Sequence, residues 1–253
     1  MLLPAGADTR TDPFDDLTDD DLATIYAYPV ERPWLRLNFV ASLDGAIADA
    51  AGHPRGLTTP ADQRVFALLR GLADVILVGA GTARSEQYAP VQPSEIDVAL
   101  RARLGLAPLP PIAVVSNSLE IPDSLLVDPP DGSGRTIVVT TSATAVGRRR
   151  DIGAHADVLV CGSDRVDPVA VRRALAARGL GRIQAEGGPR LTRDLAAAGV
   201  LDELCLTLSP LLLAGGSSRL TAGAELDAPV HLRLGHVLAA DDELLLRYVR
   251  EGA

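Results

Sequence analysis

The sequence contains no lysine, because all 24 of its basic residues are arginine. Chemistry that depends on lysine, such as a Schiff base or the lysine of a P-loop, is therefore excluded. Any phosphate must be held by arginine, by hydroxyls or by backbone N–H groups. The formal net charge is −9, and the sequence lacks the clustered basic face that nucleic-acid-binding proteins present.

Cysteine is scarce as well, with two residues and no C-x-x-C pair. Cys161 and Cys205 lie inside apolar, strand-like runs, which is typical of buried, reduced thiols in a cytoplasmic protein. The four histidines (positions 53, 155, 231 and 236) match no metal-binding spacing. No metal site is expected.

Long apolar runs are also missing. No run reaches the roughly 18 residues of a membrane span, and the N-terminal stretch turns acidic at once instead of basic and then apolar. We therefore expect a cytoplasmic protein whose partners include neither a membrane nor a nucleic acid.

Short apolar runs alternate with helical stretches from Trp34 onward. Strands are expected at 34–41, 74–79, 111–115, 135–140, 157–160, 182–186, 203–209, 230–238 and 243–250. Helices are expected at 60–71, 95–104, 168–179 and 189–198. The alternation predicts an α/β fold with a mostly parallel sheet and helices on both faces. The last two strands have no helix between them, so they should form an antiparallel edge.

The first 30 residues are expected to be a peripheral N-terminal extension, and residues 31–253 to form the main domain. Within the extension, Thr18 followed by three aspartates is a typical helix start, since acids are favourable at that end of the helix dipole.

Three segments at strand ends carry the candidate functional residues. The first, R-P-W-L-R-L-N-F-V-A-S-L-D-G (32–45), is a strand that runs into an Asp-Gly turn. The second, D-V-I-L-V-G-A-G-T (74–82), is a buried strand that ends in two glycines and a hydroxyl. The third, E-G-G-P-R-L (186–191), is a strand end followed by paired glycines and a proline that opens a helix.

The two glycine-rich turns are typical of phosphate binding. Glycine lets the backbone approach a ligand closely, and a helix N-terminus offers N–H groups to phosphate. Both turns follow strands of a parallel sheet, so they should meet at the sheet edge where open α/β folds bind nucleotides. The second segment is not a G-x-G-x-x-G fingerprint, because Arg84 stands three residues after Gly81. The pattern indicates a dinucleotide site without identifying the dinucleotide.

The three segments are followed by G-V-L-D-E-L (199–204) and S-P-L-L-L (209–213). In this order, the blocks resemble the pyrimidine reductase of riboflavin biosynthesis. That family is the C-terminal reductase domain of the bifunctional riboflavin deaminase/reductase, and the resemblance covers about Arg32 to the C-terminus. It implies an NADPH-dependent oxidoreductase with a dihydrofolate-reductase-like fold, usually a homodimer. The substrate it implies is 5-amino-6-(5-phosphoribosylamino)uracil. The H-x-E…P-C-x-x-C signature of the zinc deaminase domain has no counterpart here.

The resemblance also implies which residues contact the coenzyme NADPH: Val40, Gly79, Gly81, Thr82, Glu86, Ser116, Gly187, Gly188, Pro189, Arg190 and Leu191. The 2′-phosphate is expected near Ser116 or near residues 140–142. Glu86 replaces the usual aspartate of the family. Glu86 and Asp44 are the candidate catalytic proton donors, although water could also supply the proton.

On the substrate side, Glu186 resembles the glutamate that accepts hydrogen bonds from pyrimidine N–H groups. Arg70 resembles the arginine that meets the substrate's ribose phosphate. An ordinary ion pair or a helix-end contact is the alternative for both. Three family positions differ: the usual lysine is Asn38, the usual Ser-x-Trp is Pro-Arg-Gly (54–56), and the usual L-x-x-R reads Pro-Val-Gln-Pro (90–93).

Two other functions stay open. Residues 57–70 resemble the stretch of dihydrofolate reductase that opens its first helix, and Asp62 would then face a pterin substrate. The alternative for Asp62 is a favourable first-turn charge. A non-catalytic nucleotide-binding protein is the second possibility, which the changed substrate positions would permit.

Overall fold

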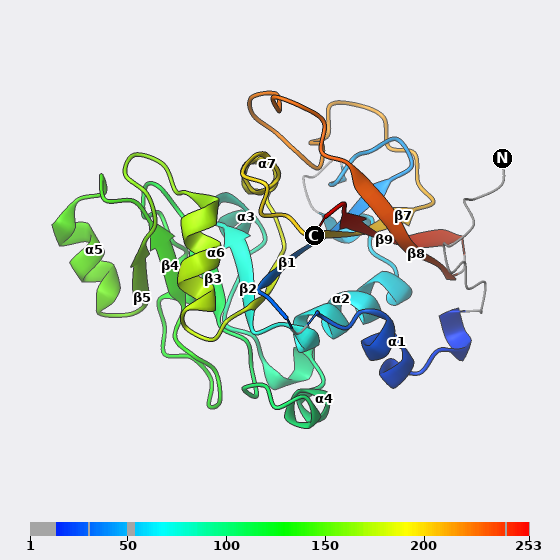
Figure 1. Ribbon diagram of the computed structural model, residues 1–253, viewed down its shortest axis with the longest axis horizontal. Helices are drawn as coiled ribbons and strands as arrows, with labels where there is room; N and C mark the ends of the chain where they lie inside the picture. Colours follow the sequence, from blue (N-terminus) through cyan, green and yellow to red (C-terminus); the bar gives the residue numbers. More distant parts are fainter. Residues whose placement is uncertain (1–13, 30, 50–53, 241, 253) are drawn as a thin grey trace.

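A computed structural model describes residues 14–29, 31–49, 54–240 and 242–252. A nine-stranded sheet runs through its centre in the order β5-β4-β3-β2-β6-β1-β7-β9-β8 (Figure 1). The strands are β1 (Trp34–Ser42), β2 (Val75–Gly79), β3 (Ile112–Val115), β4 (Ile137–Thr140), β5 (Asp157–Val160), β6 (Arg182–Ala185), β7 (Glu203–Ser209), β8 (Leu232–Ala240) and β9 (Glu243–Arg250).

Strands β1 to β7 pair in parallel, and β9 pairs antiparallel with both β7 and β8. The predicted mostly parallel sheet with an antiparallel C-terminal edge is therefore confirmed. Every predicted strand is present, with ends that differ by two residues at most. Strand β2 is buried along almost its whole length because helices and loops cover both of its faces, which explains its uninterrupted apolar sequence.

The helices are α1 (Asp19–Ile25), α2 (Pro60–Leu72), α3 (Ala80–Ser85), α4 (Val98–Arg103), α5 (Val146–Gly153), α6 (Pro168–Ala176) and α7 (Pro189–Ala197). The predicted helix at 95–104 begins later, because Pro93–Glu95 forms a separate 3₁₀ turn and Asp97 caps α4. The helix predicted to reach residue 179 ends at Ala176 instead. Helix α5 was not predicted, because it buries only Ile152 and so has no apolar periodicity.

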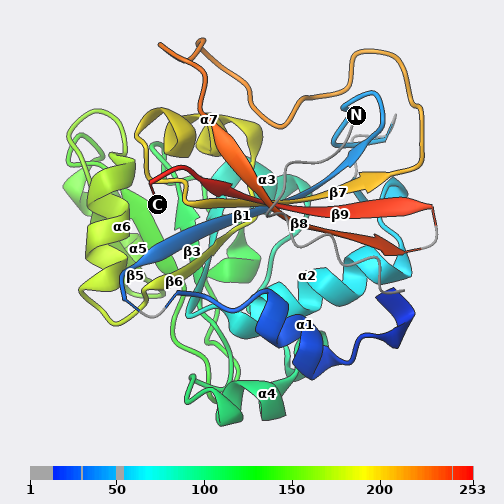
Figure 2. The same ribbon diagram turned by 45° about the vertical axis from the view of Figure 1, so that its right-hand side comes forward.

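Helices cover both faces of the sheet, as predicted. Figure 2 shows α1 and α2 below the strands β1, β7 and β9, with α7 above them. Residues 14–29 were predicted to lie in a peripheral extension, but Leu22 of α1 and Tyr26, directly after this helix, are buried in the core cluster between α2 and the sheet. Their apolar side chains make this segment part of the core. Within the described residues, no helix has the length and apolar character of a membrane span.

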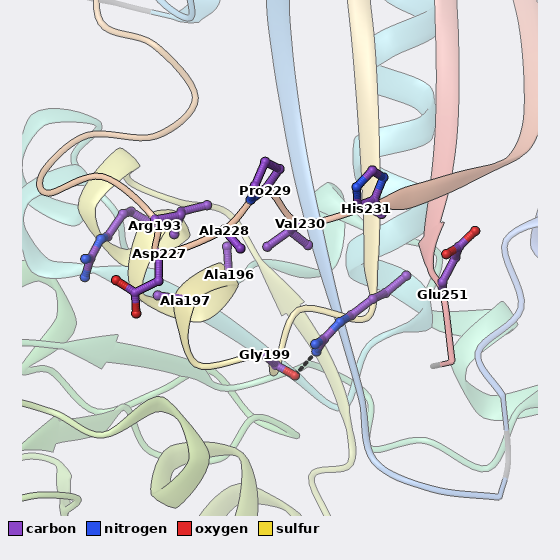
Figure 3. Close-up of a pocket in the computed structure, with 12 residues that line it drawn as sticks. Arg193, Ala196, Ala197, Gly199, Asp227, Ala228, Pro229, Val230, His231 and Glu251 are labelled. Carbon is purple, nitrogen blue, oxygen red and sulfur yellow. Dashed lines mark hydrogen bonds between the residues drawn. The ribbon is translucent and has the colours of Figure 1, made fainter.

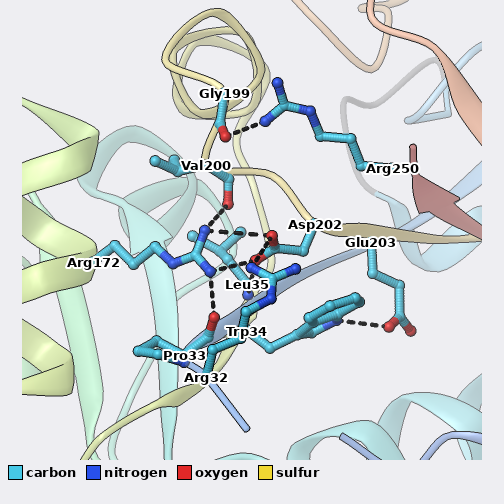
Figure 4. A network of polar contacts seen from close by, with 10 residues as sticks. All are labelled: Arg32, Pro33, Trp34, Leu35, Arg172, Gly199, Val200, Asp202, Glu203 and Arg250. Atoms are coloured by element: carbon cyan, nitrogen blue, oxygen red, sulfur yellow. Dashed lines mark hydrogen bonds and ion pairs between the residues drawn. The ribbon is translucent and has the colours of Figure 1, made fainter. Parts of the chain in front are cut away.

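The amino-terminal ends of β1 and β7 are tied together by charged groups (Figure 4). The buried Asp202 carboxylate accepts hydrogen bonds from Leu35 N at 2.8 Å and from Arg32 Nη1 at 3.1 Å, and it pairs with Arg172 Nη2 at 3.0 Å. Arg172 also donates to the carbonyl oxygens of Pro33 and Val200. We call the end of the sheet at which the parallel strands begin the amino edge. The opposite end, at which β1, β2, β6 and β7 finish, is the carboxyl edge.

Candidate coenzyme and substrate site

The two glycine-rich turns meet at the carboxyl edge, as the sequence predicted. Strands β2 and β6 are neighbours, and Gly79 N donates to Gly187 O at 2.8 Å. Gly187 has φ +88°, and a Cβ there would lie 2.6 Å from Phe39 Cζ. A Cβ on Gly188 would collide with the hydroxyl of Thr82. Both positions therefore require glycine, and the two turns form one continuous backbone surface.

Helix α7 begins directly at this surface. Gly188 is its N-cap residue, no side chain caps it, and Pro189 occupies the first helical position. The N–H groups of the first turn and the positive end of the helix dipole therefore face the same edge, an arrangement that favours phosphate. Beside it, a Cβ on Gly81 would meet nothing within 4 Å, so the backbone there is open to close approach.

Hydroxyl groups continue the edge on the side of β3 and β4. Ser116 follows β3 and is buried, and its backbone N donates to Val139 O at 2.9 Å. After β4 the chain turns, and Arg149 Nη1 donates to Thr141 O at 3.0 Å and to Ser142 O at 2.9 Å. The Arg149 guanidinium thus contacts this turn. Strand β4, which the turn follows, lies two strands from β2, a separation of about 10 Å across the sheet.

On the other side of the glycine turns lies the end of β1. Val40 is buried and pairs with Thr207 of β7. Asp44 lies in the exposed turn after β1, where its carboxylate accepts hydrogen bonds from Ser42 Oγ at 2.5 Å and from Ala214 N at 2.7 Å. These hydrogen bonds, that of Ser42 first, lower the pKa of Asp44, so the group is ionised and poorly suited to donating a proton. The other candidate, Glu86, is half-buried at the C-cap of α3.

The two residues predicted to bind the pyrimidine substrate bind one another. Arg70 forms two parallel hydrogen bonds of 2.8 Å with the carboxylate of Glu186. Burial alone would lower the pKa of Arg70, but Glu186 raises it above the usual arginine value. Tyr88 Oη donates to Glu186 at 2.6 Å, and Arg70 Nη1 reaches Glu95 at 3.1 Å. The ion pair that the sequence left as the alternative is thus present in the structure.

Asp62 lies on the same face of α2 as Arg70. Positions 62, 66 and 70 follow one another at helical spacing, and the Phe66 ring lies 4.4 Å from the Arg70 guanidinium carbon. Asp62 is buried, with 5% of its surface exposed, and this burial raises its pKa to about 6. The nearby Glu243 carboxylate also raises the pKa, whereas the hydrogen bond with Thr207 lowers it. A buried carboxyl that titrates near neutral pH is typical of functional sites.

Three of these partners were missed by sequence reasoning. Phe66 could have been found from its spacing between Asp62 and Arg70 on α2. Tyr88 and Glu95 lie in the irregular chain after α3, where no periodicity indicates which side chains turn inward.

A hollow of about 390 Å³ lies elsewhere, between the second half of α7, residues 226–231 and the end of β9 (Figure 3). Arg250 spans it and donates to Gly199 O. None of its lining residues belongs to the predicted site. The candidate site is therefore the carboxyl edge and not this hollow.

Comparison with known proteins points to one family. The profile of the RibD C-terminal domain matches residues 33–246. A 2,5-diamino-6-ribosylamino-4(3H)-pyrimidinone 5′-phosphate reductase of Archaeoglobus fulgidus is 28% identical over 187 residues, which is 74% of this chain and 84% of the relative. The protein of the same name from Methanothermobacter thermautotrophicus is 27% identical, over 87% of this chain and all of the relative.

Solved structures agree. A pyrimidine reductase-like protein from Corynebacterium diphtheriae superposes with a TM-score of 0.78 at 26% identity, covering 92% of this chain and 99% of the other. The riboflavin biosynthesis reductase Rib7 of Saccharomyces cerevisiae has a TM-score of 0.58 at 17% identity, covering 90% and 97%, which indicates a shared fold.

Proposed function

Because the chain belongs to the RibD C-terminal domain family, whose dihydrofolate-reductase-like fold it shares, we propose that it is an NADPH-dependent reductase. Its proposed substrate is 5-amino-6-(5-phosphoribosylamino)uracil or a closely related pyrimidine, as the names of its relatives suggest. The observation that carries the proposal is the contact between the two glycine turns at the uncapped start of α7.

A nicotinamide dinucleotide fits the groups along the carboxyl edge. The pyrophosphate would meet the backbone at Gly187, Gly188 and the first turn of α7, where an added Cβ would collide with Phe39 or Thr82 and displace the turn. The adenosine half would extend over Ser116 towards the turn after β4. Arg149 and the hydroxyls of that turn would then meet the 2′-phosphate, which favours NADPH over NADH.

The nicotinamide would extend the other way, over β6 and towards Val40 and the α2 face. When bound, the coenzyme supplies the hydride that reduces C1′ of the ring-opened ribosylamine. The chain itself positions the substrate and excludes water. Glu86 is the remaining side-chain candidate for the proton, since the Asp44 carboxylate is held in its ionised form.

Glu186 can still bind a pyrimidine while paired with Arg70. A carboxylate has about four acceptor positions, and Arg70 and Tyr88 use three of them. A phosphate could replace the half-exposed Glu95 as the partner of Arg70 Nη1 without breaking the pair with Glu186. Both substrate roles are therefore compatible with the ion pair.

A direct assay tests the proposal. Purified protein is incubated with NADPH and the phosphoribosylaminopyrimidine, and the ribitylamino product is identified by mass spectrometry. We expect turnover, and Arg70→Ala should reduce it by at least 100-fold, equivalent to about 2.7 kcal/mol of barrier. Binding of NADPH without turnover of any pyrimidine or pterin would instead identify a non-catalytic nucleotide-binding protein.

A pterin or dihydrofolate is the second candidate, and Asp62 is the observation that favours it. Its buried carboxyl, with a pKa near 6, lies on the α2 face next to β7 and could pair with a pterin ring. With dihydrofolate as substrate, Asp62→Asn should cost at least 100-fold in turnover, and Arg70→Ala much less. With the pyrimidine, the order of the two variants should reverse. Full activity of both variants on both substrates would refute both assignments.

We also propose that the protein is a cytoplasmic homodimer. Leu206 pairs with Leu246 and Leu208 with Leu244, so these side chains form an apolar row on one face of β7 and β9. Leu244 is 42% exposed, and burying this row against a second copy would remove it from water. The two free cysteines are both buried, as suits a reducing compartment. A molar mass of one chain at all concentrations in light scattering would contradict the dimer.

A further inference from the structure

The connection between β7 and β8 contains a long irregular segment, residues 211–225, which we call the strap. It runs beside the turn that follows β1, and both views of the molecule show the two segments side by side (Figures 1 and 2). Leu43 N donates to Leu211 O at 2.9 Å, and Ile47 N donates to Ser218 O at 3.2 Å. Segments of this length without secondary structure are often functional.

Asp44 is the centre of this contact. Its carboxylate accepts from Ala214 N at 2.7 Å, from Leu213 N at 3.2 Å and from Ser42 Oγ at 2.5 Å. Ser42 Oγ in turn accepts from Ala46 N at 2.9 Å, so the turn after β1 is closed on itself. Asp44 therefore adds side-chain hydrogen bonds to the backbone hydrogen bonds that join the strap to this turn.

The backbone of the strap needs this support. Ala214 adopts φ +56°, in the left-handed region that residues other than glycine rarely occupy. The next residue, Gly215, has φ +75°. The backbone N–H groups of Leu213 and Ala214 both donate to the Asp44 carboxylate. The carboxylate therefore supports the strap at the residue whose backbone conformation is unfavourable.

The other end of the strap reaches α7. Ala222 N donates to Pro189 O at 3.1 Å, and Arg193 Nε donates to Ala224 O at 3.0 Å. Pro189 is the first residue of α7, the helix whose start faces the glycine turns. The strap thus connects the turn after β1 with the first turn of α7 across the carboxyl edge.

We propose that Asp44 is a positioning residue, which fixes the strap and through it the first turn of α7, and so sets the affinity for the coenzyme. The proposal rests on the proposed function for the identity of the ligand, but the mechanical link from Asp44 to α7 does not. Asp44 touches neither coenzyme nor substrate in this role. It replaces the role of proton donor that the sequence allowed for this residue.

The test begins without ligand, using hydrogen exchange on Asp44→Ala and Asp44→Asn. In Asp44→Ala the amides of Leu213 and Ala214 should lose protection because their acceptor is gone, and the amide of Ala222 should lose protection because the strap transmits the change. In Asp44→Asn the loss should be smaller, because the amide oxygen of asparagine still accepts hydrogen bonds. Asp44 is exposed, so both variants are expected to fold. Unchanged exchange at Ala222 would refute the link, whatever the protein binds.

The second measurement is the dissociation constant of NADPH together with kcat and KM. Asp44→Ala should raise the dissociation constant and the KM for NADPH about tenfold, with kcat at saturation nearly unchanged. Ser217→Ala, which removes a separate strap contact with Ala48 O, should act in the same direction but more weakly. Asp128→Asn, a change to an exposed acid on another loop, is the matched control and should alter neither constant.

Each other outcome overturns part of the account. If kcat falls 100-fold while NADPH affinity and the exchange at Ala222 are unchanged, and the alkaline limb of the pH profile is altered, Asp44 is a proton donor. If Ala222 loses protection but NADPH affinity does not change, the strap has a structural role only. A wild-type protein that does not bind NADPH would refute the proposed function, while the exchange at Ala222 would still decide the link.

Discussion

Two buried carboxyl groups, Glu203 at the amino edge of the sheet and Asp62 at the carboxyl edge, have pKa values shifted in opposite directions. At the amino edge, burial alone would raise the pKa of Glu203, but Arg36 and Arg247 lower it to about 2. At the carboxyl edge, burial raises the pKa of Asp62 to about 6, and the positions that surround this edge are glycine turns and an uncapped helix start. Glu203 is thus neutralised by cations of the protein, as Glu186 is by Arg70 at the carboxyl edge, whereas the pKa of Asp62 is shifted by burial, Thr207 and Glu243, none of which is a cation.

The amino edge has the signature of a structural site. Trp34 Nε1 donates to Glu203 at 2.8 Å, and Arg36 Nε and Arg247 Nε do so at 2.7 and 2.8 Å. Asp74 likewise accepts three hydrogen bonds from Arg182, from its backbone N at 2.8 Å, Nη2 at 2.8 Å and Nε at 3.1 Å. The charges of Glu203 and Asp74 are therefore paired with donors of the protein itself.

The largest effect should follow from breaking the amino edge. Glu203→Gln leaves the fully buried Arg36 guanidinium without its anionic partner, which typically costs about 3–5 kcal/mol. The free energy of unfolding, measured by urea titration at neutral pH, should fall by that amount. A loss below about 1 kcal/mol would show that the amino edge does not depend on this charge pair.

The contribution of the Glu203–Arg36 pair to the free energy of unfolding depends on pH in a defined direction. The folded pKa of about 2 lies below the model-compound value of 4.5, so the folded state binds fewer protons between these values. The stability that Glu203 contributes is therefore complete above about pH 4.5 and is lost as the pH falls towards 2. Glu203→Gln should remove this part of the acid destabilisation.

Asp62→Asn should have a smaller effect on stability, and of the opposite sign. The pKa of Asp62 is about 6 in the folded state and 3.8 in the unfolded state, so the folded state binds more protons between these two pH values. The stability of the wild-type protein therefore falls as the pH rises from 3.8 to 6. The neutral amide avoids this cost. We expect a gain of about 1–3 kcal/mol at pH 8 and none at pH 3, measured by urea titration. Equal stability of both proteins at pH 8 would contradict the raised pKa.

An effect of similar size concerns the choice of coenzyme. A charge-assisted contact with the 2′-phosphate is worth about 1.5–3 kcal/mol, so NADPH should bind at least tenfold more tightly than NADH. Arg149→Ala should remove most of this preference and leave NADH affinity unchanged. The exposed Arg148 on the same helix supplies the matched control, Arg148→Ala. Equal affinities of the wild-type protein for both coenzymes would refute the assignment of the turn after β4.

Local patterns explain what could be predicted from the sequence. The strands follow from apolar runs, and the glycine turns follow from residue types that only a turn or a close approach requires. The pairing of Arg70 with Glu186 joins positions 116 residues apart, and no local pattern specifies it. The same holds for Asp62, whose position on a helix start was visible but whose neighbours Thr207 and Glu243 come from distant strands.

We propose above all that the coenzyme binds the carboxyl edge of the sheet and not the amino edge. Glycines near the two ends of β6 allow this to be tested, because one lies at each edge. Gly181 precedes the strand, where a Cβ would lie an ordinary 3.8 Å from Pro33 Cα, and Gly188 follows it, where a Cβ would collide with Thr82. Calorimetric titration with NADPH compares wild type, Gly181→Ala and Gly188→Ala, after each is found to unfold cooperatively. The account predicts a loss of at least 100-fold in affinity, about 2.7 kcal/mol, for Gly188→Ala and less than about twofold for Gly181→Ala. Wild-type affinity in Gly188→Ala, or an equal loss in both variants, would contradict it.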